Sequence, residues 1–244
     1  MMIQDKSALV KQLQRDILGW QGVSTPYQSK STLGLGVIEQ VFPHGTFPLG
    51  CVHEFLGFHS EDRAASSGFI AGILSKLMEK DGVCFWISTS PIIYPPAMSS
   101  FGISPDRLVF VRMSTEREVL WAVEEALKCK GLAAVVGEVS QLSFVESRRL
   151  QLAVEESRVT GFILRRSEKN MHATACVARW QIRSLPSAAV DELPGIGFPC
   201  WEVSLLKVRN GKTGKWKVSW LVEDGFTLEK PMTWRTLEAP RKIG

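Results

Sequence analysis

The sequence predicts an α/β fold in which a mostly parallel sheet is flanked by helices and antiparallel strands are added at the C-terminal end. Two observations carry this prediction. Between Gly50 and Leu164, short apolar runs alternate with helical patterns, as in parallel sheets that are covered on both faces. From Ala173 onward, apolar and polar residues alternate instead, which is typical of antiparallel strands with one solvated face.

Each expected element follows from its own residue pattern. The apolar runs predicted to form buried parallel strands are Val52–Leu56, Val83–Ile87, Leu108–Val111, Leu132–Val136 and Gly161–Leu164. Apolar residues at three- and four-residue steps predict helices over Ser66–Lys80, Thr115–Lys128 and Glu146–Ser157. The alternating strands are Ala173–Arg183, Trp201–Val208 and Trp216–Val222, with turn signals at Asn210-Gly211 and Thr213-Gly214.

Four tryptophans lie on the alternating strands, namely Trp180, Trp201, Trp216 and Trp220. We expect them to form core and cross-strand contacts, because large aromatic side chains dominate such cores. An aromatic platform on which single-stranded DNA stacks is the alternative.

The chain divides into an N-terminal arm with its linker (residues 1–30) and one main domain (residues 31–244). Residues 5–20 predict an amphipathic helix, because Leu9, Leu13, Ile17 and Trp20 recur at helical spacing. A linker containing Gly, Ser and Pro follows from Gly22 to Thr32. The helix is expected to pack on the main body or on a partner.

Composition excludes several classes of protein. With 45% hydrophobic and 22% charged residues, the chain can build a real core. It has no apolar run of the ~18 residues that a membrane helix needs, and its charged N-terminus does not resemble a signal peptide, so we expect a cytoplasmic protein without membrane contact. The five cysteines form no C-x-x-C pair and are expected to be reduced thiols. The four histidines show no metal-ligand spacing, and no cofactor is expected.

Charge is distributed unevenly. Residues 1–160 carry a net charge of −2, whereas residues 161–244 carry +6. Five of the cations lie around one turn of the expected C-terminal hairpin: Lys207, Arg209, Lys212, Lys215 and Lys217. Strand alternation predicts that Lys207, Arg209, Lys215 and Lys217 share a wet face, opposite Leu206, Val208, Trp216 and Val218, which would pack on the sheet. These cations predict contact with DNA phosphates or with an acidic partner surface; lysines that protect a sheet edge are the alternative.

The segment after the first strand is where an α/β nucleotide fold holds phosphate. There a glycine-rich loop and a helix N-terminus bind the phosphates, a lysine neutralises them, and a hydroxyl group reaches Mg²⁺. The segment from Gly57 to Ala64, with the sequence GFHSEDRA, takes this place.

Upstream of it, the spacing Gly45-x-x-Pro48-x-Gly50-x-x-x-Glu54 resembles the entry to the ATP-binding core of the RecA family, a phosphate-loop NTPase-like fold. Aligned without gaps from Gly57, the second loop glycine of that family falls on Asp62, its lysine on Arg63 and its hydroxyl residue on Ala64. Glu61 and Asp62 would repel a triphosphate, and Ala64 offers no Mg²⁺ ligand, so this sequence predicts a degenerate phosphate loop.

Two further positions of the RecA-like pattern lack carboxylates. Ser90 follows the second strand, where the family has its catalytic glutamate, and Gly137 follows the apolar run at Leu132–Val136, where a metal-holding aspartate is expected. Glu138 is one residue away, which would turn it to the other face of a strand. The sequence therefore predicts no catalytic residues and a protein without ATPase activity.

Several segments together resemble the ImuA family of RecA-like proteins more closely than RecA in general, over about residues 31–222. They are Gly45-x-x-Pro48-Leu49-Gly50-x-x-x-Glu54, Trp86-Ile87-x-x-x-Pro91 with Tyr94-Pro95-Pro96-Ala97, Gly102-Ile103-x-x-Asp106-Arg107-Leu108, Arg148-Arg149-Leu150-Gln151-Leu152-Ala153 and Trp201-x-Val203-x-Leu205-Leu206-Lys207. Their order and spacing carry the resemblance.

The resemblance implies an accessory role in SOS-induced, error-prone translesion DNA synthesis. The implied partners are ImuB, an inactive relative of Y-family polymerases, and an alternative C-family DNA polymerase, with RecA and DNA as further candidates. Three alternatives stay open on the sequence alone: a divergent ATPase of the RecA family, a cell-division inhibitor similar to SulA, and a plain DNA-binding module.

Overall fold

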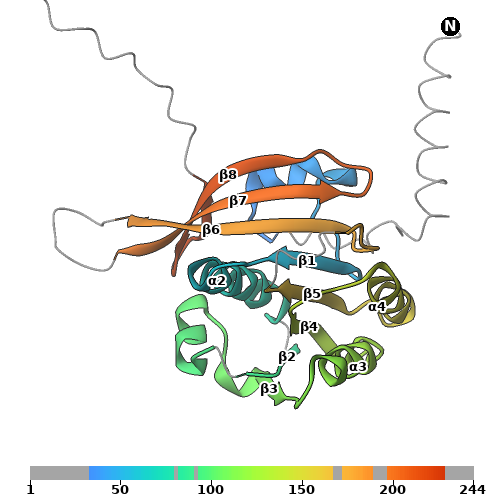
Figure 1. Ribbon diagram of the computed structural model, residues 1–244. Helices are drawn as coiled ribbons and strands as arrows, with labels where there is room; N and C mark the ends of the chain where they lie inside the picture. The colour runs from blue at the N-terminus through green and yellow to red at the C-terminus, as the bar shows by residue number, and fades with distance from the viewer. Residues whose placement is uncertain (1–32, 80–81, 91–92, 167–171, 189–196, 229–244) are drawn as a thin grey trace, which may run out of the picture.

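The computed structural model describes residues 33–79, 82–90, 93–166, 172–188 and 197–228 (Figure 1). The helix expected over residues 5–20 and the linker expected over residues 22–32 lie outside these ranges, so the N-terminal arm stays a prediction. No helix among the described residues combines the length and the hydropathy that crossing a bilayer requires.

The described strands form one nine-stranded sheet with the order β3-β2-β4-β5-β1-β6-β7-β8-β9. The strands are β1 (Val52–Leu56), β2 (Val83–Ser88), β3 (Leu108–Arg112), β4 (Leu132–Val139), β5 (Thr160–Arg165), β6 (Ala178–Ala188), β7 (Phe198–Val208), β8 (Gly214–Leu221) and β9 (Gly225–Leu228). The strands from β3 to β6 run parallel, and β7, β8 and β9 extend the sheet as antiparallel neighbours. This confirms the predicted fold class.

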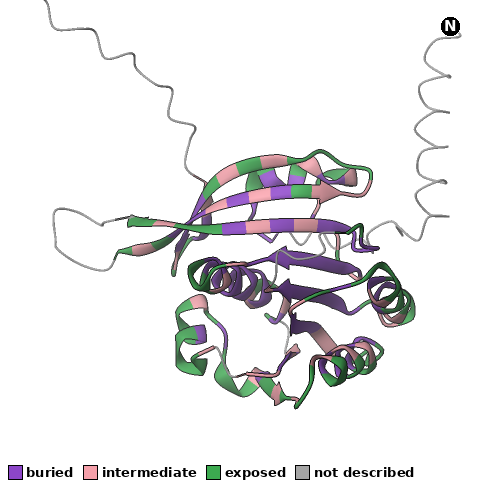
Figure 2. Cartoon of the chain, in the orientation of Figure 1, coloured by how far each residue is buried: buried purple, intermediate pink, exposed green. Residues whose placement is uncertain are grey.

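Helices cover the two faces of the parallel strands separately (Figure 1). The helices are α2 (Ser60–Leu77), α3 (Glu116–Leu127) and α4 (Phe144–Ser157), and short 3₁₀ segments are η1 (Gly36–Val41), η2 (Pro43–Gly45), η3 (Pro95–Phe101) and η4 (Pro105–Arg107). Buried residues of α2 and η1 pack in one apolar cluster, and buried residues of α3 and α4 pack in another. The central parallel strands are consequently buried on both faces, as Figure 2 shows for β1 and β5.

Aromatic side chains fill the cluster on the α2 face. The ring of Trp180 on β6 stacks against Phe55 on β1 with a centroid distance of 5.9 Å, and Phe69 of α2 contacts both. Trp201 and Trp220 are also buried in this cluster. The tryptophans thus form core contacts, and these three rings are not available as a platform for bases.

Both helices on the opposite face begin with a capping box, which the sequence signature Ser/Thr-x-x-Glu produces. Thr115 accepts a hydrogen bond from the backbone of Glu118, and Ser143 accepts one from Glu146. The capping box at Ser143 places the start of α4 at Phe144, two residues before the predicted start.

Several strand predictions are wrong in detail. β3 was expected to be buried, but it is the edge strand, and Val109 and Phe110 are each 40% exposed. β6 was expected to begin at Ala173 as an antiparallel strand, but it begins at Ala178 and pairs with β1 in parallel. The strand β9 was not predicted at all.

Candidate functional site

The connection between β1 and α2 is shorter than the predicted loop. α2 begins at Ser60, so the loop consists of Gly57, Phe58 and His59, and residues 61–64 lie on the first turns of the helix. The prediction of a loop through Ala64 is therefore wrong. The physical reason is that acidic residues in a first turn stabilise a helix N-terminus, and both Glu61 and Asp62 stand there.

The N-terminus of α2 already holds a negatively charged side chain, the carboxylate of Glu61. The Glu61 backbone N–H and the Ser60 hydroxyl donate hydrogen bonds to the Glu61 carboxylate, and these bonds lower its pKa below the usual range. Asp62, the next residue, is buried. Two acidic residues of the same chain therefore stand on the first turn, where backbone N–H groups would hold a phosphate.

Gly57 is fixed by a close backbone approach. Gly57 is not among the glycines with positive φ, so a special backbone angle does not explain it. Instead, a Cβ at this position would lie 3.1 Å from the backbone N and Cα of Arg63, and the Gly57 N–H donates to the carbonyl of Arg165 (2.9 Å). The turn is thus packed directly against the start of α2.

Of the two positions at which a RecA-like nucleotide site carries carboxylates, one differs from the sequence prediction and one agrees with it. β4 continues to Val139, so Gly137 lies inside the strand rather than after it. A Cβ on Gly137 would approach Cγ2 of Val123 in α3 to 2.6 Å, which leaves no space for an aspartate. Ser90 follows β2 as predicted, and its carbonyl accepts a hydrogen bond from the Ser88 hydroxyl (2.8 Å).

Glu138 points to the opposite face, as predicted, but it is enclosed there. Its Oε1 accepts a hydrogen bond of 2.7 Å from Trp86 Nε1, and the residue is 2% exposed. Burial raises the pKa of this carboxyl, although the cations Arg166 and Arg63 partly offset the effect. The acidic side chain at the end of β4 is therefore bound to an indole of β2 rather than directed at solvent.

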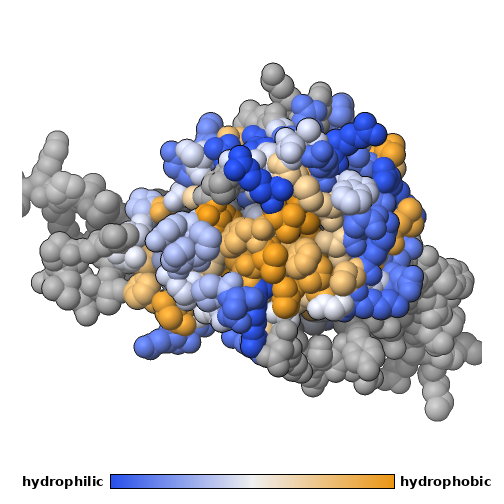
Figure 3. Space-filling view, turned by 90° about the horizontal axis from the view of Figure 1, so that it is seen from below, coloured by the Kyte–Doolittle hydropathy of each residue, from blue (hydrophilic) through white to orange (hydrophobic). Residues whose placement is uncertain are grey.

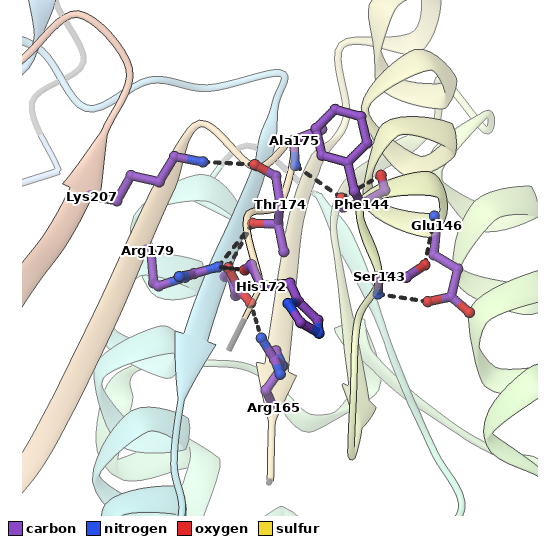
Figure 4. A network of polar contacts seen from close by, with 11 residues as sticks. Ser143, Phe144, Glu146, Arg165, His172, Thr174, Ala175, Arg179 and Lys207 are labelled. Atoms are coloured by element: carbon purple, nitrogen blue, oxygen red, sulfur yellow. Dashed lines mark hydrogen bonds and ion pairs between the residues drawn. The ribbon is translucent and has the colours of Figure 1, made fainter. Parts of the chain in front are cut away.

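A second buried polar network surrounds Glu54 on the α4 face of β1 (Figure 4). Its Oε1 binds Arg165 Nη1 at 2.7 Å, and its Oε2 binds Arg179 Nε at 2.7 Å and the Thr174 hydroxyl at 2.8 Å. We did not single out this set, although charged residues inside predicted buried strands are a usable signal, since such charges require partners.

The cations of the predicted hairpin lie on the face that strand alternation predicts. One of the apolar residues predicted for the opposite face does not. Lys207 and Arg209 donate to the backbone carbonyls of Thr174 and Ala175, and Lys215 pairs with Glu202 at 2.8 Å. Lys212 and Lys217 are exposed. Leu206 was expected to pack on the sheet but is 45% exposed, because the β6–β7 register shifts at this point and inserts one extra residue into β7.

Apolar side chains gather at the β3 edge of the sheet. Figure 3 views the molecule from this side and shows apolar atoms across the middle of the face. Val109 and Phe110 belong to β3, which among the described strands has a neighbour only on the β2 side. An edge strand with exposed apolar residues is a ready template for pairing with another chain.

Within the part of the chain that the structure describes, no three His, Cys, Asp or Glu side chains are grouped so that they could hold a metal ion. All five cysteines are free thiols, and Cys129 is exposed. Burial raises the pKa of Cys51 to about 12, so this thiol stays protonated.

Comparison with known proteins agrees with this geometry. No family profile matches the chain. A solved structure of the RadB recombinase matches with a TM-score of 0.56 at 12% identity and covers 80% of this chain and 98% of that one, which shows a RecA-like fold. Protein ImuA of Caulobacter vibrioides, found in two strains, is 32% identical over 207 residues, which is 80% of this chain and 84% of the relative. The chain therefore belongs to the ImuA family.

Proposed function

We propose that this protein is a non-catalytic, RecA-like accessory protein of SOS-induced, error-prone translesion DNA synthesis. In the cytoplasm it would assemble an ImuB-like polymerase subunit with an alternative C-family DNA polymerase, and RecA is a further candidate partner. Membership of the ImuA family supports this role.

The observation that carries the non-catalytic part is the start of α2. Glu61 and Asp62 occupy the helix N-terminus at which a RecA-like ATPase would bind phosphate. Gly57 is packed against Arg63, so the loop cannot widen without moving the helix. A negatively charged, closed turn is unsuited to a triphosphate, because like charges at contact distance repel.

The edge strand β3 supports the assembly part. Within the described part of the chain no strand pairs with one side of β3, and the exposed Val109 and Phe110 supply apolar surface beside that edge. Proteins bind extended segments in this way, with backbone hydrogen bonds giving affinity and side-chain pockets giving specificity. We therefore place the polymerase-subunit contact at β3.

The test is recovery of the two polymerase subunits with the tagged protein from DNA-damaged cells, combined with a count of damage-induced mutants. The wild-type protein should recover both subunits. Phe110→Arg on β3 should lose them and lower the mutant count, whereas Leu152→Arg, which changes an exposed leucine of α4, should behave as wild type. If the wild-type protein recovered neither subunit, the proposed assembly role would be refuted. If Phe110→Arg recovered the subunits as well as wild type, the proposed contact at β3 would be refuted.

A further inference from the structure

The strands β6, β7 and β8 have a polar face that points away from α2. Trp180, Trp201 and Val218 pack into the core on the α2 side. Because side chains alternate along a strand, the neighbouring residues point the other way. On that side α3 packs on β2 and β4, and α4 packs on β1 and β5. The basic face, as we call it, comprises Arg179 and Arg183 of β6, Lys207 of β7 with Arg209 just after it, and Lys215 and Lys217 of β8.

Cations outnumber carboxylates among the described residues of this face. At its outer end, Glu202 is the register partner of both Arg183 and Lys217, and it forms an ion pair with Lys215. A single carboxylate thus stands among three cations. Arg183 and Lys217 are exposed and make no ion pair with any described residue.

At the inner end of the basic face, backbone carbonyls hold the cations in place. Arg179 Nη2 donates to the carbonyl of His172 (2.8 Å), Lys207 Nζ donates to that of Thr174 (2.6 Å), and Arg209 Nη2 donates to that of Ala175 (3.0 Å). Figure 4 shows Arg179 and Lys207 converging on this segment. Glu54 also pairs with Arg179 (2.7 Å). The carbonyl groups orient Lys207 and Arg209 but carry no net charge, so they leave the positive charge of these two side chains in place.

The crowding of these cations affects the pKa of Lys207. Burial lowers the pKa of its ammonium group, and the nearby positive charges of Arg179 and Arg209 lower it further, although Glu54 partly opposes them. An anion placed over these side chains would relieve the repulsion between them.

We propose that the basic face binds the phosphate backbone of nucleic acid without reading its bases. Polar residues such as Gln181 and Ser204 lie between the cations. The buried tryptophans point to the other face, so they cannot stack on bases as single-strand binders do. This function goes beyond the proposed assembly role and uses the opposite end of the sheet from β3.

The experiment measures fluorescence anisotropy of labelled mixed-sequence DNA, duplex in one arm and single-stranded in the other, across a salt series. Phosphate contacts release counterions, so the logarithm of the binding constant should fall with the logarithm of salt concentration by about 0.9 per contacted phosphate on a duplex. Arg183→Ala combined with Lys217→Ala should reduce that slope by about two and weaken binding to every sequence alike. The arm with the higher affinity identifies the form of DNA that the face accepts.

A matched control removes the same charge elsewhere. Lys128→Ala combined with Lys130→Ala alters exposed lysines at the end of α3 and before β4, and it should keep the wild-type slope. Thermal melts establish that both double variants fold. Equal slopes for the two double variants would overturn the proposal. Failure of the wild-type protein to bind either form of DNA at low salt would also overturn it. If the wild-type protein bound polyglutamate instead of DNA, the basic face would be assigned to an acidic protein partner.

Discussion

Trp86 Nε1 on β2 donates a buried hydrogen bond of 2.7 Å to Glu138 Oε1 on β4. Trp86 is the register partner of Val136, and Glu138 lies two residues further along β4, on the same face of the sheet. The pair therefore ties neighbouring strands together at the end of the sheet where a RecA-like ATPase keeps its carboxylates. Here the carboxylate has a structural role.

The first prediction concerns the pH dependence that Glu138 produces. Burial raises the pKa of its carboxyl in the folded state above the ordinary value of 4.5. An acid whose folded-state pKa is raised contributes most to stability at low pH, where it is protonated in both the folded and the unfolded protein. This contribution is lost as the pH rises from the unfolded-state pKa through the folded-state pKa. Glu138→Gln keeps an acceptor for Trp86 and cannot ionise. Relative to wild type, its free energy of unfolding should therefore improve as pH rises from about 4 to 8.

Urea unfolding of both proteins across this pH range provides the measurement. A difference in unfolding free energy that stays constant with pH would show that Glu138 is not the group responsible.

The second prediction concerns Gly57. Gly57→Val should lower the free energy of unfolding by about 1–3 kcal/mol, because overpacking against the backbone of Arg63 forces α2 to shift. Gly131→Val is the matched control, since no atom lies within 4 Å of a Cβ at Gly131. Chemical unfolding of the two variants checks the comparison, and equal stability would mean that the turn is not tightly packed.

The third prediction concerns the Glu54 network. Glu54→Gln removes the charge that compensates Arg165 and Arg179, and Arg165 is fully buried. Leaving a buried cation uncompensated should cost about 3–5 kcal/mol. Glu156→Gln is the control, because its pair with Lys130 is exposed, and it should leave the melting temperature unchanged. Similar melting temperatures for the two variants would contradict the structural role of Glu54.

The sequence predicts the first five strands and their order of appearance because burial on both faces leaves continuous apolar runs such as Leu132–Val136. It does not predict the start of α2, because an ungapped comparison with a phosphate loop assigns Glu61 and Asp62 to a loop, whereas acidic residues equally favour a first helical turn. The helix preference prevails in the structure.

The polar networks could not be predicted for a different reason. Glu54 meets Arg165 and Arg179 only after β5 and β6 pair with the two sides of β1, and strand order is not visible in one sequence. The extra residue at Leu206 has no local signal either, since neither glycine nor proline marks the bulge. Alternation alone therefore placed the cations correctly and this leucine incorrectly.

The central claim is that the closed, acidic turn at the start of α2 does not bind nucleotide, and calorimetric titration with ATP and Mg²⁺ tests it most directly. We predict no saturable heat of binding at physiological nucleotide concentration, because Glu61 and Asp62 hold the place of the phosphates and Gly57 is packed against Arg63. A saturable isotherm in the micromolar range that Arg63→Ala abolishes would contradict the claim.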